Sequence, residues 1–458
     1  MRQDQISSRN YFFLVCVVAV ILRLMLLVYV APYTPIKYYA NPDAYNYENI
    51  ALNLVNHGVF SDEVHPPYVL DLHRTPLYPV FLAAIYRLSE SSRTAAVLIQ
   101  LLLGSLTVGL TYLFSRALLQ SHQIALFASL ILALDPLTIM YANLLMTETL
   151  FTFFLVAGSM TLVKYLHSDR LLWLLLSAVM YASAVLTRPI GQFLPLALIP
   201  LIVFAARPEQ RWGALLRGLL FASISLALIF VWVFRNHQVA GIWLISDIGE
   251  YNLAYYSART VLEVAEDVSK EEATTKIDTM IKARDHSEIL SPAARVKLER
   301  QTALQVFKQY PLPTMKVYLD SILQFLINPG LDNICAQLSH AENVEGCKVT
   351  KSISNPNFIE KMRLKFGNMD NIQLVIAVWS VFFLFTIYTL SAVGIYVLIK
   401  NRQWFELFNL FVIIAYLILL SAGGQTTSRF RVPTIPYLSM LASVGLVAIK
   451  DRLTISRR

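Results

Sequence analysis

The sequence predicts an all-α polytopic membrane protein with about ten transmembrane helices, and composition is the first reason. Of 458 residues, 56% are hydrophobic and 15% are charged, whereas soluble domains carry roughly 25% charged residues. This apolar surplus exceeds what one globular core could bury. Apolar runs of about 20 residues, long enough to cross a bilayer, are the second reason. They lie at 11–31, 94–114, 124–140, 149–163, 171–186, 190–206, 214–234, 372–399, 404–422 and 432–449.

The positions of the charges orient these spans. The net charge of +8 would suit nucleic acid, but the charges fall at helix ends, which indicates membrane topology and no nucleic-acid partner. With the N-terminus inside, the short basic loops face the cytoplasm, and we expect a bacterial inner-membrane protein. The first apolar stretch lacks a small-x-small cleavage site, so we expect it to be retained. The basic loops contain Arg116, His122, Lys164, Arg170, Arg207, Arg211, Lys400, Arg402, Lys450, Arg452, Arg457 and Arg458.

The opposite set of loops contains two long segments, which define the predicted domains. Residues 1–254 form a transmembrane catalytic module whose first outer loop is 32–93, residues 255–371 a helical extracytoplasmic insertion, and 372–458 the C-terminal spans. Within the first outer loop, 75–88 is too short to cross and is predicted to be a juxtamembrane helix. The insertion is charged and helical, and its stretch MKVYLDSILQFLI has an apolar face that we expect to rest on the bilayer.

The three cysteines do not form a metal-ligand spacing. Cys16 lies inside the first span, whereas Cys335 and Cys347 share one outer loop. An extracytoplasmic loop would permit a disulfide between these two, and two unrelated thiols are equally consistent with the sequence.

Ionisable residues gather at the predicted outer ends of the spans. Charges at the mouth of a helical bundle are costly and mark a polar site by default. Two carboxylates and several guanidiniums at one level indicate an acid or base pair facing an anion-binding patch. These residues are Asp43, Arg74, Glu148, Arg188, Arg235, Arg429 and Arg431.

Each of these charges also has a simpler interpretation. Asn41, Pro42 and Asp43 have the order of a helix start, with Gly58 at the end of the same helix. Glu148 could cap the following span, the arginines could snorkel or bind lipid headgroups, and His73 could be a hydrogen-bonded surface histidine. Capping and snorkelling do not readily explain why at least five segments place charges on one side, so we favour a functional site.

Several segments in order resemble the glycosyltransferase C superfamily, on the branch of protein O-mannosyltransferases and the aminoarabinose transferase of lipid A. They are PDAYNYENIALNL, HRTPLYPVFLAAIY, DPLTIMYANLLMTETLF, LTRPIGQFLPLALIP and RFRVPTIPYLSML. The resemblance covers roughly residues 10–250 well and the last 90 loosely, and the block at 255–365 matches no family segment. Many members have Lys-Pro-Pro where this chain has Arg74-Thr75-Pro76, and often Asp at the position of Glu148.

The resemblance implies a polyprenyl-phosphate sugar as donor, with a lipid, glycan or protein as acceptor. It implies that Asp43 is the catalytic base, that Glu148 is the second acidic residue and that Arg74 contacts the donor phosphate. From their location we add Arg188, Arg429 and Arg431 as further phosphate contacts. Substrate-binding candidates are Tyr45, Tyr47, His73, Tyr141, Arg235 and Asn236. No cofactor is required by this scheme, although two carboxylates and a histidine could meet a divalent metal.

Three other functions compete with this interpretation. A lipid-linked glycan flippase or other transporter would place polar residues through the bilayer midplane, whereas here Arg23 is the main charge inside a span. A glycan polymerase is a close enzymatic alternative. A non-catalytic membrane scaffold would have no use for the paired carboxylates.

Overall fold

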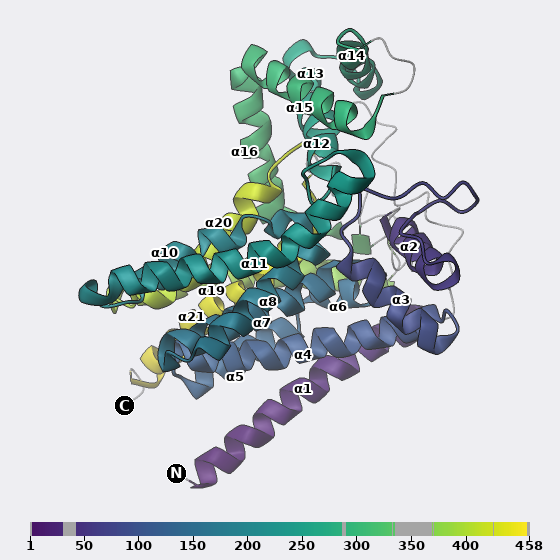
Figure 1. Cartoon of the computed structure of the whole chain (residues 1–458). Helices are drawn as coiled ribbons and strands as arrows, with labels where there is room; N and C mark the ends of the chain where they lie inside the picture. The colour runs from purple at the N-terminus through teal and green to yellow at the C-terminus, as the bar shows by residue number, and fades with distance from the viewer. Residues whose placement is uncertain are drawn as a thin grey trace.

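The protein is described here from a computed structural model, which covers residues 2–30, 43–285, 290–331, 333–334, 369, 371–424 and 426–455. All regular elements among these residues are helices. The long helices run side by side, and both termini lie at one end of the bundle (Figure 1). The opposite end carries α2 (Asp43–His57), α3 (Leu77–Ser89) and a lobe built from α12 to α16.

The first half of the chain supplies most of the bundle. Its elements are α1 (Arg2–Val30), α4 (Arg93–Leu119), α5 (His122–Ala133), α6 (Pro136–Ala142), α7 (Glu148–Ser168), α8 (Leu171–Thr187), η3 (Pro189–Gly191), α9 (Leu194–Ala197), α10 (Ile199–Phe204), η4 (Pro208–Gln210) and α11 (Arg211–Ala240). The second half supplies the lobe and the last spans. Its elements are α12 (Ile248–Asn252), the π-helix η5 (Leu253–Ala258), α13 (Arg259–Glu266), α14 (Lys270–Lys282), α15 (Pro292–Gln309), α16 (Pro311–Ile327), α19 (Asn371–Lys400), α20 (Trp404–Ser421), η8 (Ser428–Thr434) and α21 (Ile435–Ile455).

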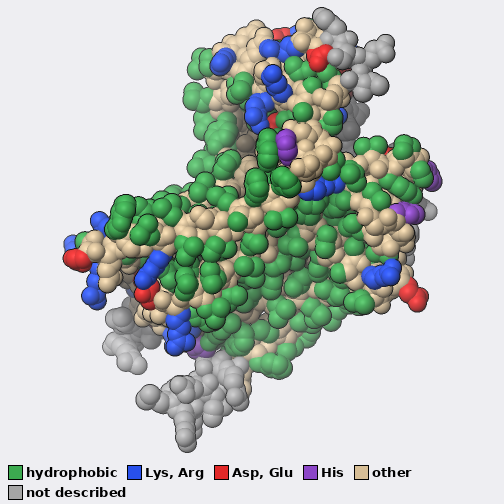
Figure 2. All heavy atoms as spheres, viewed as in Figure 1, with side chains coloured by type: hydrophobic (Ala, Val, Ile, Leu, Met, Phe, Trp, Pro, Cys, Tyr) green, Lys and Arg blue, Asp and Glu red, His purple; other side chains and the backbone are tan. Residues whose placement is uncertain are grey.

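The predicted all-α polytopic class is confirmed. Seven helices in the described part of the chain are long and apolar enough to cross a membrane, and the bent pair α5–α6 makes an eighth. The segments at 171–187 and 189–204 are shorter apolar helices. Hydrophobic side chains cover much of the visible bundle surface, as lipid contact requires (Figure 2). The count of ten spans stays a prediction.

The predicted span at 124–140 is broken. α5 and α6 meet at an angle of 58°, because Pro136 cannot continue the preceding helix. Asp135 caps the new start, since its Oδ2 accepts from the Thr138 backbone N–H at 2.7 Å.

Small residues allow the last spans to pack closely. A Cβ placed on Gly394 of α19 would lie 2.0 Å from the Leu441 carbonyl oxygen of α21, and one on Gly445 would lie 2.1 Å from that of Leu390. Such small-residue contacts are the usual way in which membrane helices approach one another. Arg23, the main charge inside a span, donates from Nη1 to the Ala19 carbonyl at 3.0 Å, and its side chain is 1% exposed.

The segment predicted to form the first outer loop contains two helices in its described part. The predicted juxtamembrane segment is helical as α3, and α2 ends before Gly58, whose φ is +68°. Both helices pack with α4 and α6 in one apolar cluster. Asn41, Pro42, Cys335 and Cys347 lie outside the described residues, so the predictions made for them stay open. Cys16 is a free, half-buried thiol.

Candidate active site

Two arginines hold Asp43 at the end of the bundle opposite the termini. Asp43 is the first residue of α2. Arg74 Nη2 donates to its Oδ1 at 2.9 Å, and Arg429 Nη1 donates to its Oδ2 at 2.7 Å. The three residues come from α2, from the segment before α3 and from η8. The predicted grouping of Asp43 with Arg74 and Arg429 is therefore present in the structure.

The electrostatics of Asp43 follow from these contacts. Burial raises the pKa of its carboxyl, but the Arg429 and Arg74 guanidiniums outweigh burial and bring the pKa to about 2. Burial lowers the pKa of Arg74, but the interactions with Tyr47, Asp43 and Asp71 outweigh burial and raise it. Asp43 is thus an ionised carboxylate at neutral pH, and about a quarter of its side chain remains exposed.

Glu148 lies behind this pair and is fully buried. Its Oε1 forms an ion pair with Arg188 Nη1 and lies 3.9 Å from Arg429 Nε. Arg188 also donates to Thr147 Oγ1 at 3.1 Å. Arg429 therefore lies between the two carboxylates that the sequence singled out. Glu148 is less accessible than Asp43, which suits a residue that fixes guanidiniums better than one that meets a substrate.

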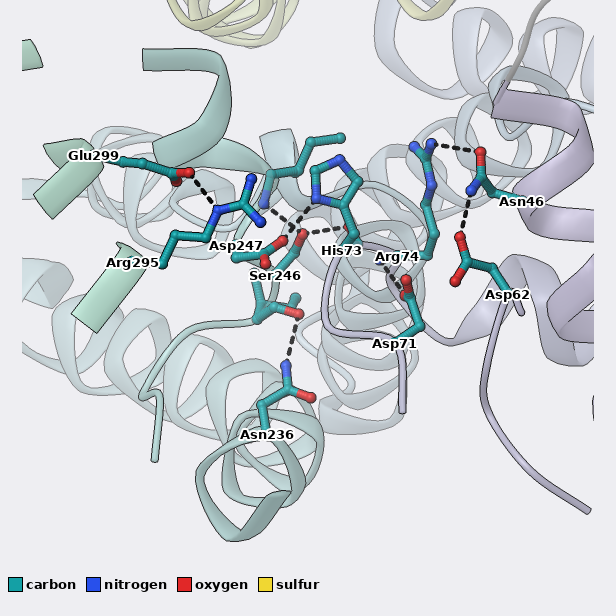
Figure 3. Close-up of polar contacts among 12 residues, drawn as sticks. Asn46, Asp62, Asp71, His73, Arg74, Asn236, Ser246, Asp247, Arg295 and Glu299 are labelled. Atoms are coloured by element: carbon teal, nitrogen blue, oxygen red, sulfur yellow. Dashed lines mark hydrogen bonds and ion pairs between the residues drawn. The ribbon is translucent and has the colours of Figure 1, made fainter. Parts of the chain in front are cut away.

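Arg74 is held on several sides. Its guanidinium carbon lies 4.9 Å from the centre of the Tyr47 ring, and its Nη2 reaches Asn46 Oδ1 at 3.4 Å. Its backbone N–H donates to Asp71 Oδ1 at 2.7 Å. Figure 3 shows Arg74, Asn46 and Asp62 in one line of polar contacts. These contacts fix the direction in which the guanidinium points.

The segment 71–74 is in turn tied to the start of the lobe (Figure 3). His73 Nδ1 lies 2.7 Å from Asp247 Oδ1, Ser246 Oγ donates to the His73 carbonyl at 2.6 Å, and the Asp247 N–H donates to the Leu72 carbonyl at 3.1 Å. Burial raises the pKa of Asp71 to about 6, against the opposing effect of its bond from the Arg74 N–H. The lobe and the Arg74 segment are therefore mechanically connected.

Four predicted site residues occupy supporting positions. Arg431 is 1% exposed and donates to the carbonyls of Phe325, Leu326 and Asn328. Arg235 donates to the Asp71 carbonyl at 2.8 Å, and the buried Asn236 donates to those of Leu244 and Ile245. His73 makes the contact with Asp247. These four side chains hold backbone or a loop in place.

The predicted tyrosines differ in accessibility. Tyr45 is 50% exposed, whereas Tyr47 and Tyr141 are buried. Tyr141 accepts a hydrogen bond from Asn333 Nδ2 at 3.0 Å. Tyr45 is therefore the tyrosine of this set with an accessible ring.

Sequence reasoning missed Asn46, Asp71 and Asp247. Asp71 precedes His73 and Arg74 by only a few residues, so its proximity was the available signal. Nothing in the pattern around Asp247 indicates its contact with His73, which spans 174 positions. Within the described residues, no group of three or more His, Cys, Asp or Glu could hold a metal ion.

Comparison with known proteins relates this geometry to a family. Residues 73–234 match the family model of dolichyl-phosphate-mannose-protein mannosyltransferase. The resemblance to the glycosyltransferase C superfamily is confirmed. The family model that matches these residues describes a glycosyltransferase. A comparison with curated proteins found no sequence match.

Solved structures of an archaeal oligosaccharyltransferase have a similar fold. The fold is similar to the oligosaccharyltransferase AglB from Archaeoglobus fulgidus in complex with an inhibitory peptide and a dolichol-phosphate, with a TM-score of 0.57 and 14% identity over 99% of this chain and 51% of that one. For the apo form of the A. fulgidus enzyme, the TM-score is 0.54 and the identity is 14%, over 97% of this chain and 51% of that one. For ArnT from Cupriavidus metallidurans in the apo state, the TM-score is 0.42 and the identity is 14%, over 96% of this chain and 79% of that one. The chain spans about half the length of the oligosaccharyltransferase.

Proposed function

We propose that the chain transfers a sugar from a polyprenyl-phosphate donor to a lipid, glycan or protein acceptor on the extracytoplasmic face of the bacterial inner membrane. The observation that carries this proposal is the position of Asp43 between Arg74 and Arg429. A carboxylate beside guanidiniums at the end of a membrane bundle offers a base and a phosphate site together. The family match and the dolichol-phosphate named for AglB support a lipid-phosphate donor.

The sidedness rests on the charges at the other end of the bundle. Both termini lie there, away from α2 and α3 (Figure 1). Because successive spans alternate in direction, the short basic loops after α4, α7 and α19 are assigned to that end as well. There, Lys164 Nζ lies 4.4 Å from the centre of the Trp173 ring. Lys and Arg are retained on the cytoplasmic side, and aromatic rings favour the interface. The site would then open to the extracytoplasmic side.

The donor phosphate would be held by guanidiniums from three segments. Arg74 and Arg429 face Asp43, and Arg188 joins them through the shared contacts of Glu148. Fixed, partly desolvated guanidiniums stabilise phosphate oxygens more strongly than solvated ones. In this scheme Arg431 contributes by supporting the end of α16, because carbonyls occupy its guanidinium.

Donor binding would also change Asp43. With two guanidiniums bound, a carboxyl of pKa about 2 is a weak base. A phosphate that shares Arg74 and Arg429 would weaken their hold on Asp43, so its pKa would rise towards a useful value. The arrangement thus makes the base effective when the donor is present.

The transfer step follows from these roles. The acceptor hydroxyl gives its proton to Asp43, and its oxygen bonds to the anomeric carbon of the sugar. The bond between that carbon and the phosphate oxygen breaks, and the electron pair leaves with polyprenyl phosphate. Arg74, Arg429 and Arg188 stabilise the charge that develops on this leaving group. We propose that guanidiniums supply the positive charge and that no metal is required.

The test is an assay of the purified chain in lipid nanodiscs. Polyprenyl phosphates carrying labelled hexoses or pentoses are supplied with separate fractions of envelope lipid, glycan and protein. Release of polyprenyl phosphate, with label in one fraction and unchanged rate in a chelator, supports the proposal. In proteoliposomes, movement of intact donor without cleavage would indicate a flippase. Absence of release with every donor and fraction would contradict transfer.

A further inference from the structure

The helix α16 carries an exposed apolar stripe that no part of the described chain covers. Five side chains at helical spacing are between 51% and 71% exposed. Such a contiguous apolar surface marks an interaction site in proteins. The stripe consists of Leu312, Met315, Leu319, Leu323 and Ile327.

The rest of α16 divides into two further faces. Val317, Ser321 and Phe325 are buried against the protein. Lys316 and Asp320 are exposed along one edge of the stripe. A helix with one face on protein, one apolar face and a charged edge has the pattern of a helix at a membrane interface, where a lysine can reach the headgroups.

The direction of α16 fits that location. In Figure 1 it runs across the direction of the long helices, as a helix lying in the plane of the bilayer surface would. Figure 2 shows hydrophobic side chains along the edge of the lobe that overhangs the sides of the bundle. The apolar edge of the lobe in Figure 2 lies on the side where Figure 1 places α16.

The stripe is also next to the surface of a span. Tyr318 OH donates to the Leu419 carbonyl at 2.9 Å, and Ser321 Oγ donates to that of Gly423. These contacts place α16 against the end of α20, where Leu419 and Leu420 are 50% and 45% exposed. The stripe helix α16 therefore lies beside the exposed apolar end of α20, one of the membrane-capable helices.

We infer that the stripe of α16 lies in the outer leaflet and seats the lobe on the bilayer. The occupant of this surface is lipid acyl chain, with Lys316 at headgroup level. Interfacial helices bury their apolar face about 5–10 Å into this boundary. The alternative occupant, a protein partner, has no comparable continuity with the bundle surface.

The location has a consequence for the active site. Arg431 donates to the carbonyls of Phe325, Leu326 and Asn328 at the C-terminal end of α16, where a cation complements the helix dipole. Arg431 is two residues from Arg429 in η8. The position of α16 on the membrane thereby sets the depth of η8, which carries Arg429, relative to the bilayer.

The inference can be tested without any assay of sugar transfer. In a full-length chain with its three cysteines replaced by serine, Leu319→Cys and Leu323→Cys are labelled with an environment-sensitive fluorophore and reconstituted in nanodiscs. Lipids bearing a doxyl quencher near the headgroup probe the bilayer, and iodide probes water. Thr275→Cys on the exposed side of α14 is the aqueous control, and Leu226→Cys on α11 is the lipid control.

We expect both α16 labels to be quenched by doxyl lipid nearly as strongly as the α11 label, and several-fold less by iodide than the α14 label. Quenching by iodide as strong as on α14 would overturn the inference, because the stripe would face water. Protection from both quenchers would overturn it as well, because protein would then cover the stripe. Size-exclusion profiles matching the cysteine-free chain establish that the variants are folded.

Discussion

Arg429 Nη1 donates to Asp43 Oδ2 at 2.7 Å, across 386 positions of the chain. The contact joins the start of α2 to η8, and Arg429 also lies 3.9 Å from the buried Glu148. A single guanidinium therefore connects both carboxylates of the proposed site.

Arg74 is expected to bind the donor phosphate directly. Arg74→Ala should weaken the binding of polyprenyl phosphate by about 10–100-fold, the value of a charge-assisted hydrogen bond. Acceptor binding should change much less. Arg217→Ala is the matched control, since Arg217 pairs with the exposed Asp169 elsewhere in the chain. Equal losses for donor and acceptor, or no loss, would argue against phosphate contact.

Glu148 is expected to stabilise the fold by compensating buried guanidiniums. Glu148→Gln leaves Arg188 without its charged partner, and breaking such a buried pair costs about 3 kcal/mol. The double variant Glu148→Gln with Arg188→Gln should recover part of this loss. Thermal unfolding in detergent measures the coupling between the two residues. Additive effects of the two substitutions would show that the pair is not coupled.

Asp71 should make stability depend on pH in a defined window. Its pKa is raised to about 6 in the folded state, against about 3.9 in the unfolded chain. The folded state therefore holds more protons between these values, and the contribution of Asp71 to stability is lost as pH rises from about 4 to about 6.

The comparison variant is Asp71→Asn, which keeps an acceptor for the Arg74 N–H but cannot titrate. The difference in unfolding free energy between wild type and Asp71→Asn should fall as pH rises across this window. A difference that stays constant with pH would contradict the assignment. Asp71→Ala, which loses the acceptor, should weaken donor binding more than Asp71→Asn does.

Packing of the last spans gives a prediction independent of function. Gly394→Ala would place a Cβ 2.0 Å from the Leu441 carbonyl oxygen, so the helices must separate. Overpacking of this kind costs about 1–3 kcal/mol. Gly213→Ala on α11 meets nothing within 4 Å and should be neutral or slightly stabilising. Equal thermal midpoints for the two variants would show that this contact does not limit the packing.

Much of the fold could be predicted from the sequence because lipid imposes strong constraints. Apolar runs of span length and basic loops identified the helices, and the short segment at 75–88 is α3. The break at Asp135 was missed because the apolar pattern continues across it, although Pro136 was a visible signal. Short-range signals of this kind are weaker than span-length hydrophobicity.

The candidate site was predictable in part for the same reason. Charges at span ends are rare, and this rarity singled out Asp43, Arg74, Glu148 and Arg429 in the sequence. The sequence could not separate Arg431 from Arg429, two residues away, because the difference lies in their partners. Arg431 holds the end of α16, whereas Arg429 faces the carboxylates. Long-range contacts such as His73 with Asp247 leave no local pattern.

The most direct test of the account is the release of polyprenyl phosphate by Asp43→Asn in folded, purified protein. The substitution keeps the shape of the side chain but removes the base, so turnover should fall by about 10²–10⁴, while binding of polyprenyl phosphate persists. Asp169→Asn, an exposed carboxylate paired with Arg217, should retain the wild-type rate. Release by Asp43→Asn at the wild-type rate would contradict the central claim.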